Sequence, residues 1–119
     1  MVKVAISGYY GFKNFGDEAI LGVLVNHLKQ LKDVDITVFS SDVDYTSKTY
    51  SVNSVKRFDL KNVIKTIRNS DVLISGGGSL LQDVTSLKSV VYYSLIIALG
   101  LLFNKKVIIF AQGVGPLNK

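Results

Sequence analysis

The chain has 119 residues, of which 48% are hydrophobic and 19% are charged. It is therefore long enough for one packed domain and too apolar for a disordered tail. It contains no cysteine and a single histidine, His27, which excludes disulfide bonds and a cysteine nucleophile, and we expect no metal site. The net charge of +5 comes from scattered side chains, twelve of them lysines. Scattered lysines are typical of a solvated surface and do not favour nucleic-acid binding.

Short β-branched or aromatic runs alternate with helical patterns along the chain. The runs predict buried parallel strands over 2–7, 36–39, 72–75 and 107–110. Apolar spacing predicts helices over 17–31, about 60–67 and about 86–103, the second of them capped by Asp59. Residues 42–57 are polar and are predicted to be irregular, with 54–58 as a candidate short strand.

Strands that alternate with helices form right-handed crossovers onto a parallel sheet. The pattern therefore predicts one doubly wound, Rossmann-like α/β domain over residues 1–119, with strand order 3-2-1-4-5. Ligands of such sheets bind outside the carboxyl ends of the strands at the switch point, here between the strands 2–7 and 72–75. Loops 8–18 and 76–85 leave the sheet at this point, and 112–116 follows the last strand. We expect these three loops to converge on one cleft.

The first loop is rich in glycine and aromatic residues, but its glycine spacing fits neither a dinucleotide fingerprint nor a P-loop. Asp17 has two interpretations, as the N-cap of the following helix or as a side chain of the cleft. Glu18 and the bulky aromatic residues make the loop richer than a cap requires. Its candidate substrate-binding residues are Gly8, Tyr9, Gly11, Asn14, Gly16 and Asp17.

The second loop contains three adjacent glycines, which lose much backbone entropy on folding. Either close packing of a helix on the sheet requires them, or their backbone N–H groups bind a polar ligand. The ligand interpretation is favoured because polar side chains follow the glycines. The candidate residues here and in the last loop are Gly76, Gly77, Gly78, Ser79, Gln82, Asp83, Gln112 and Gly113.

The charges of the first two loops favour sugar hydroxyls over an anion. Asp17, Glu18 and Asp83 are acidic, and Lys13 is the only cation in these loops, so a phosphate or carboxylate would be repelled. Carboxylates accept hydrogen bonds from hydroxyls and can act as general bases toward them. Asp17 and Asp83 are therefore weak candidates for a catalytic role. His27 is interpreted as a helix-edge residue.

The segment Val90–Phe103 is hydrophobic nearly all round but, with fourteen residues, too short to span a bilayer. One sheet cannot cover every face of such a helix. We expect its outer face to meet a second domain, a second copy of the chain or a lipid surface.

Four segments together resemble the N-terminal part of the polysaccharide pyruvyl transferase family, most closely the branch that modifies secondary cell-wall polymers in bacteria with S-layers. They are 7–21 with Asn14, Gly16 and Asp17, then 71–86 with Gly76-Gly-Gly-Ser79 and Gln82-Asp83, then Tyr92-Tyr93, and finally Gln112-Gly-Val-Gly-Pro116. The resemblance implies a two-domain, glycosyltransferase-like (GT-B-like) protein with a further C-terminal domain. It also implies transfer of the enolpyruvyl group of phosphoenolpyruvate, the donor substrate, onto two sugar hydroxyls as a ketal, with no cofactor.

The resemblance implies a division of labour between the two domains. The anionic donor needs arginine or lysine side chains, and no arginine lies in the predicted cleft loops. We therefore expect this chain to bind the sugar acceptor, for which lipid-linked ManNAc is the expected form, and to be inactive alone. The expected location is cytoplasmic, with contact to the inner face of the membrane. The alternatives are the acceptor half of a glycosyltransferase and a non-catalytic assembly module docking through Val90–Phe103.

Overall fold

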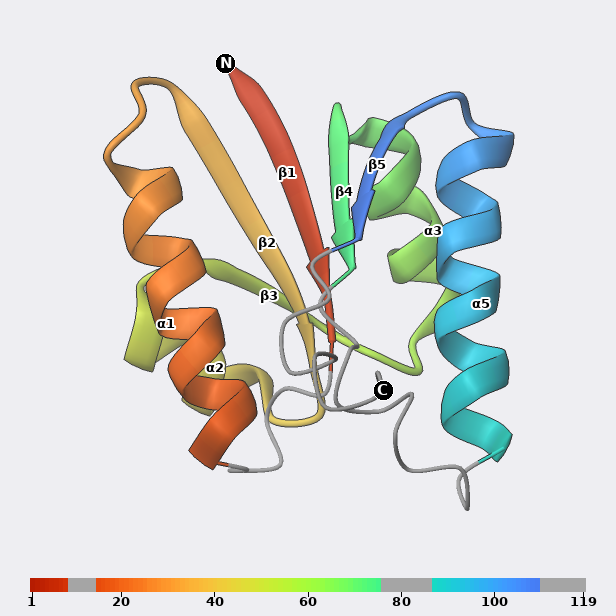
Figure 1. Ribbon diagram of the computed structural model, residues 1–119, viewed down its shortest axis with the longest axis horizontal. Coiled ribbons are helices and arrows are strands. Elements are labelled where there is room, and N and C mark those ends of the chain that lie inside the picture. Colours follow the sequence, from red (N-terminus) through yellow and green to blue (C-terminus); the bar gives the residue numbers. More distant parts are fainter. Residues whose placement is uncertain (9–14, 76–86, 110–119) are drawn as a thin grey trace, which may run out of the picture.

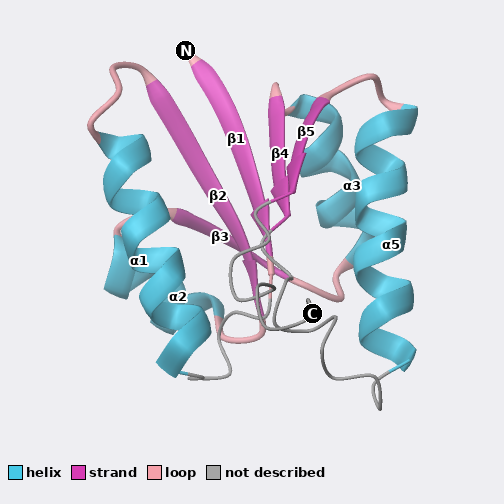
Figure 2. Ribbon diagram, in the orientation of Figure 1, coloured by secondary structure: helices cyan, strands magenta, loops and turns pink. Residues whose placement is uncertain are grey.

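The computed structural model describes residues 1–8, 15–75 and 87–109, and of residues 15–17, 87–90 and 93 it describes the backbone alone. Strands and helices alternate along the chain, and the strands form one parallel sheet with helices on both faces (Figures 1 and 2). In chain order the elements are β1 (Val2–Ser7), α1 (Phe15–Lys29), β2 (Val34–Ser40), α2 (Val43–Tyr50), β3 (Asn53–Lys56), α3 (Leu60–Asn69), β4 (Val72–Ser75), α5 (Leu87–Leu102) and β5 (Lys106–Ile109).

The strand order is β3-β2-β1-β4-β5, as the sequence predicted, so the fold is a Rossmann-like, doubly wound α/β sheet. β1 lies at the centre and pairs in parallel with β2 on one side and with β4 on the other. The chain therefore reverses its direction of travel across the sheet after β3, which places the switch point between β1 and β4.

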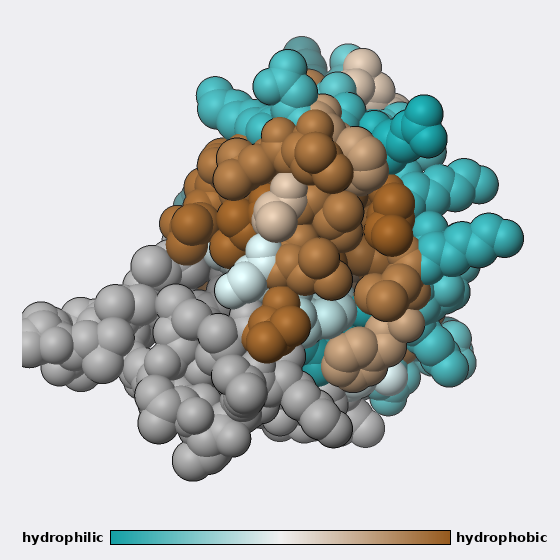
Figure 3. All heavy atoms as spheres, turned by 90° about the vertical axis from the view of Figure 1, so that its right-hand side faces the viewer, coloured by the Kyte–Doolittle hydropathy of each residue, from teal (hydrophilic) through white to brown (hydrophobic). Residues whose placement is uncertain are grey.

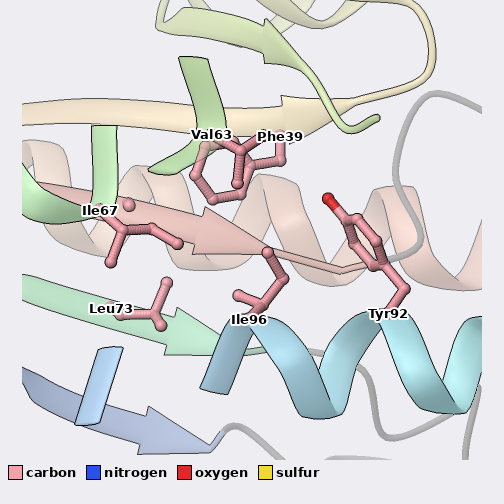
Figure 4. Close-up of a cluster of buried hydrophobic side chains, with 7 residues drawn as sticks. Phe39, Val63, Ile67, Leu73, Tyr92 and Ile96 are labelled. Carbon is pink, nitrogen blue, oxygen red and sulfur yellow. The ribbon is translucent and has the colours of Figure 1, made fainter. Parts of the chain in front are cut away.

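Successive residues of a strand point to opposite faces of the sheet. Both faces are apolar here because consecutive residues of the central strands are apolar. In β1, Val4 and Ile6 pack under α1, whereas Ala5 packs under α3 and α5. The first core cluster consists of Val4, Ile6, Leu21, Val25, Ile36, Val38 and Ile74. The second consists of Ala5, Phe39, Val63, Ile67, Leu73, Tyr92 and Ile96, and lies between the sheet and the helices α3 and α5 (Figure 4). These two layers hold the carboxyl ends of the strands in place.

The region 42–57, predicted to be irregular apart from a candidate strand at 54–58, contains the strand β3 and also the helix α2, which was not predicted. The Asp42 carboxylate caps α2 by accepting a hydrogen bond from Tyr45 N at 3.1 Å. The helix is fixed to the sheet by a buried hydroxyl pair, Ser40 Oγ and Thr46 Oγ1 at 2.7 Å, more than by an apolar stripe. The prediction failed here because apolar periodicity does not detect a polar attachment of this kind.

The other element boundaries differ from the prediction by a few residues. α1 begins at Phe15, so Asp17 lies in its first turn and the N-cap interpretation of Asp17 is wrong. Asp59 does stand at the N-cap of α3, but its side chain makes no capping hydrogen bond. Its carboxylate instead accepts from Asn62 Nδ2 at 2.6 Å. β3 ends at Lys56, two residues before the end of the predicted strand.

One side of α5 carries exposed apolar side chains, and the partner expected on this side stays a prediction. Tyr92, Ile96 and Gly100 face the sheet and are buried. Figure 3 shows the side of the molecule that carries α5, with apolar side chains gathered across it. The exposed apolar residues of α5 and β5 are Val91, Leu95, Leu101, Leu102, Ile108 and Ile109. Among the described helices, none combines the length and apolar character needed to cross a membrane.

Candidate functional site

Three neighbouring strands end at the same edge of the sheet. Ser7 of β1 is the register partner of Ser75 of β4, and Ser75 is in turn the partner of Ile109 of β5. The carboxyl ends of β1, β4 and β5 therefore lie side by side. This confirms the topological basis of the predicted cleft, namely that the loops of the first and fourth main strands start from one rim.

Most of the predicted site residues lie outside the described residues. They are Tyr9, Gly11, Asn14, Gly76, Gly77, Gly78, Ser79, Gln82, Asp83, Gln112 and Gly113. Gly8 follows β1 directly, and Gly16 and Asp17 lie in the first turn of α1. The contacts of these residues with a substrate stay a prediction, as does the catalytic role of Asp17 and Asp83.

The switch point carries a buried hydroxyl that the sequence analysis did not single out. Ser7 is the last residue of β1 and is fully buried, and its Oγ has no hydrogen-bond partner among the described residues. Ser75, beside it on β4, is also buried. A buried hydroxyl without a partner costs free energy, and this one lies at the carboxyl end of β1, at the switch point of the sheet.

Glu18 is held at the start of α1 by a residue from α2. The Tyr50 hydroxyl lies 2.6 Å from Glu18 Oε1 and 3.0 Å from Glu18 O, and donates to these oxygens. Glu18 is only 9% exposed. The sequence analysis counted Glu18 as a charge of the cleft, whereas the structure shows a carboxylate tied to Tyr50. This contact fixes the first turn of α1, in which Asp17 lies.

A second part of the same edge lies at the ends of β2 and β3, where Ser40 and Lys56 are register partners. A pocket of about 420 Å³ lies there. It is lined by Ser40, Ser41, Lys56, Arg57, Phe58 and Asp59. The pocket therefore places two cations, Lys56 and Arg57, at a part of the carboxyl edge that the sequence analysis did not consider.

Arg57 is held in this pocket by two aromatic rings. It is 4% exposed, and its Cζ lies 4.9 Å from the ring centroids of both Phe58 and Tyr92. The two rings meet edge to face at 5.2 Å. The Tyr92 hydroxyl donates to Arg57 O at 2.5 Å. Burial raises the pKa of Tyr92, and the charge of Arg57 partly opposes this shift.

The sequence analysis missed Arg57 because it extended the candidate strand to residue 58. With β3 ending at Lys56, the segment Lys56-Arg57-Phe58 becomes the turn that leaves the carboxyl end of a strand. That position is where ligands of parallel sheets bind. His27, in contrast, lies as predicted at an exposed edge of α1, with its Nδ1 2.9 Å from Val23 O.

The parallel sheet and its central switch point define a Rossmann-like α/β domain. The chain belongs to the polysaccharide pyruvyl transferase family, whose family model matches residues 14–119. No curated protein and no solved structure was found to match it. Membership of this family indicates a transferase of polysaccharide biosynthesis. This agrees with the resemblance stated from the loop motifs.

Proposed function

We propose that this chain is the acceptor-binding domain of an enzyme that transfers the enolpyruvyl group of phosphoenolpyruvate to a cell-wall polysaccharide as a ketal. The observation that carries the proposal is the family match over residues 14–119. The common edge of β1, β4 and β5 supports it, because this edge gives the motif-bearing loops one place from which to meet a substrate. The acceptor in this proposal is lipid-linked ManNAc, used at the inner face of the cell membrane.

The reaction needs one base and a site for two hydroxyl groups. A proton adds to the methylene carbon of the donor, and a sugar hydroxyl attacks the resulting cationic carbon while a carboxylate takes the hydroxyl proton. Phosphate then leaves, and the second hydroxyl closes the ketal with loss of its own proton. Asp17 and Asp83 are the carboxylates proposed to contact these hydroxyls. The anionic donor needs further cations, and we propose that they come from the C-terminal domain that the resemblance implies.

The test is an assay of the full-length enzyme with phosphoenolpyruvate and a ManNAc-containing acceptor, followed by mass spectrometry. We expect a ketal product and one phosphate released per product. Asp17→Asn and Asp83→Asn should each lower kcat by about 10²-fold or more if the residue acts as the base. Asp35→Asn is the matched control, because Asp35 lies near the amino end of β2 and accepts from Asn53 Nδ2 at 2.8 Å.

The assay also separates this proposal from the glycosyltransferase alternative. Consumption of a nucleotide sugar in place of phosphoenolpyruvate would contradict the proposed reaction. Unchanged turnover in both aspartate variants would remove Asp17 and Asp83 from the mechanism and leave the reaction itself standing.

A second candidate function is an assembly module that pairs with another copy through α5. The observation that favours it is the exposed apolar surface of α5 and β5, in which Leu102 is 75% exposed. Exposed apolar patches of this kind are common at protein interfaces. Light scattering after size exclusion should then show a dimer that Leu102→Glu converts to a monomer. Leu31→Glu is the matched control, since Leu31 is 59% exposed just beyond α1. A monomeric unmodified chain would contradict this candidate.

A further inference from the structure

We propose that the pocket beside Arg57 is a binding site for a phosphate- or carboxylate-bearing ligand. The pocket lies at the ends of β2 and β3, whereas the predicted acceptor loops follow β1, β4 and β5 in the sequence. The binding of an anion rests on the structure alone. Only the identity of that anion as the pyruvyl donor rests on the proposed function.

The pocket has the position and size of a ligand site. It lies at the carboxyl edge of a parallel sheet, where ligands of this fold class bind. Its volume of about 420 Å³ lies within the range of roughly 300–1,000 Å³ found for small-molecule pockets. Its lining also includes Asp59, directly before the first turn of α3.

Arg57 is preorganised to bind an anion. Its guanidinium lies beside two aromatic rings, and its own backbone carbonyl accepts from the Tyr92 hydroxyl. The side chain therefore loses little conformational entropy when a ligand arrives. A guanidinium is also the side chain best suited to bind carboxylate or phosphate through two parallel hydrogen bonds.

The net charge of the lining favours an anion. Lys56 is exposed and adds a second cation to that of Arg57. Asp59 is the only carboxylate among the described lining residues, and it accepts a hydrogen bond from Asn62. Among the described lining residues, two side chains are therefore cationic and one is anionic, whereas the sequence of the loops 8–18 and 76–85 is acidic.

Two ligands of the proposed reaction carry a phosphate group that this pocket could bind. Phosphoenolpyruvate carries a phosphate and a carboxylate on a three-carbon unit, whereas a carrier-linked sugar acceptor carries phosphate alone. The experiment is isothermal titration calorimetry of the chain with phosphoenolpyruvate and, separately, with inorganic phosphate. Phosphoenolpyruvate binding at least tenfold tighter than phosphate would assign the pocket to the donor, and equal affinities would assign it to the phosphate of the acceptor.

The expected result is saturable binding of at least one of these anions, weakened about tenfold to hundredfold by Arg57→Gln. Arg68→Gln is the matched control, because Arg68 is exposed in the last turn of α3, away from the pocket. If circular dichroism shows that Arg57→Gln is unfolded, Lys56→Gln tests whether the pocket binds the anion. Lys56 is exposed, and its loss should still weaken anion binding several-fold.

The inference is overturned if the folded chain binds neither anion. It is also overturned if Arg57→Gln, or Lys56→Gln where the former is unfolded, binds as tightly as the unmodified chain. Turnover by the full-length enzyme together with unchanged anion affinity in the pocket variants would leave the proposed function standing and remove this site. Anion binding that the pocket variants weaken, without turnover by the full-length enzyme, would leave this site standing and remove the proposed function.

Discussion

Replacing Phe39 by alanine is expected to lower the free energy of unfolding by about 3–5 kcal/mol. Phe39 is fully buried in β2 and packs in one cluster with Val63, Ile67 and Leu73 (Figure 4). Its truncation leaves a cavity between the sheet and α3 that these neighbours cannot fill without leaving their own packing. Because a domain of this size is stable by only about 5–15 kcal/mol, the variant should unfold at a much lower urea concentration.

Phe58→Ala is the matched control for Phe39→Ala, because it removes the same side chain from a position that is 68% exposed. Its loss of about 1 kcal/mol should reflect the edge-to-face contact with Tyr92 and the contact with Arg57. Urea unfolding followed by circular dichroism measures both values. A smaller loss for Phe39→Ala than for Phe58→Ala would contradict the packing described for β2 and α3.

Replacing Gly100 by alanine should destabilise the protein, although alanine is the better helix former. A Cβ at Gly100 would lie 2.7 Å from Leu73 Cδ2 and 2.9 Å from Val107 Cγ2, closer than carbon atoms pack. Leu73 is fully buried and Val107 is a stiff β-branched residue, so neither can move aside cheaply. We expect a net loss of about 1–2 kcal/mol after the gain in helix propensity.

Gly22→Ala is the control for Gly100→Ala, because Gly22 lies within α1 and its Cβ would meet only Tyr50 Cε1, at 3.6 Å. There the substitution should stabilise the protein by about 0.5–1 kcal/mol. The two variants should thus change the unfolding free energy in opposite directions. Equal stabilisation by both would show that α5 does not approach β4 and β5 as closely as described.

The strands and the principal helices could be predicted from local patterns. The run Val72–Ser75 was predicted with its observed limits, and Val2–Ser7 likewise, because each is a β-branched run bounded by polar or glycine residues. The predicted strand order also matches, since alternating strands and helices allow few right-handed arrangements of a parallel sheet. α2 was missed because a hydroxyl pair, Ser40–Thr46, attaches it to the sheet. An apolar stripe in the same place would have been detected by its periodicity.

The candidate site could be predicted only in part. The pattern of glycines and carboxylates in residues 8–18 and 76–85 led to the family and to an acceptor site, and the family match agrees with the first of these. Arg57 carried no signal of its own, because an arginine after a polar segment is usually a solvated side chain. Its importance depends on Phe58 and Tyr92 lying beside its guanidinium.

Local sequence was sufficient for every element except α2, for the order of the strands and for the family. Each of these depends on residues that are close along the chain or on motifs that follow one another in the sequence. The carboxylate tied to Tyr50 and the buried cation beside Tyr92 depended on the fold. In these two contacts the partners are separated by 32 and by 35 residues along the chain. Such contacts form only when packing on the two apolar faces of the sheet brings distant segments together. The loop motifs therefore indicate the family from sequence alone. The pocket beside Arg57 forms only because Tyr92 of α5 packs next to the residue that follows β3.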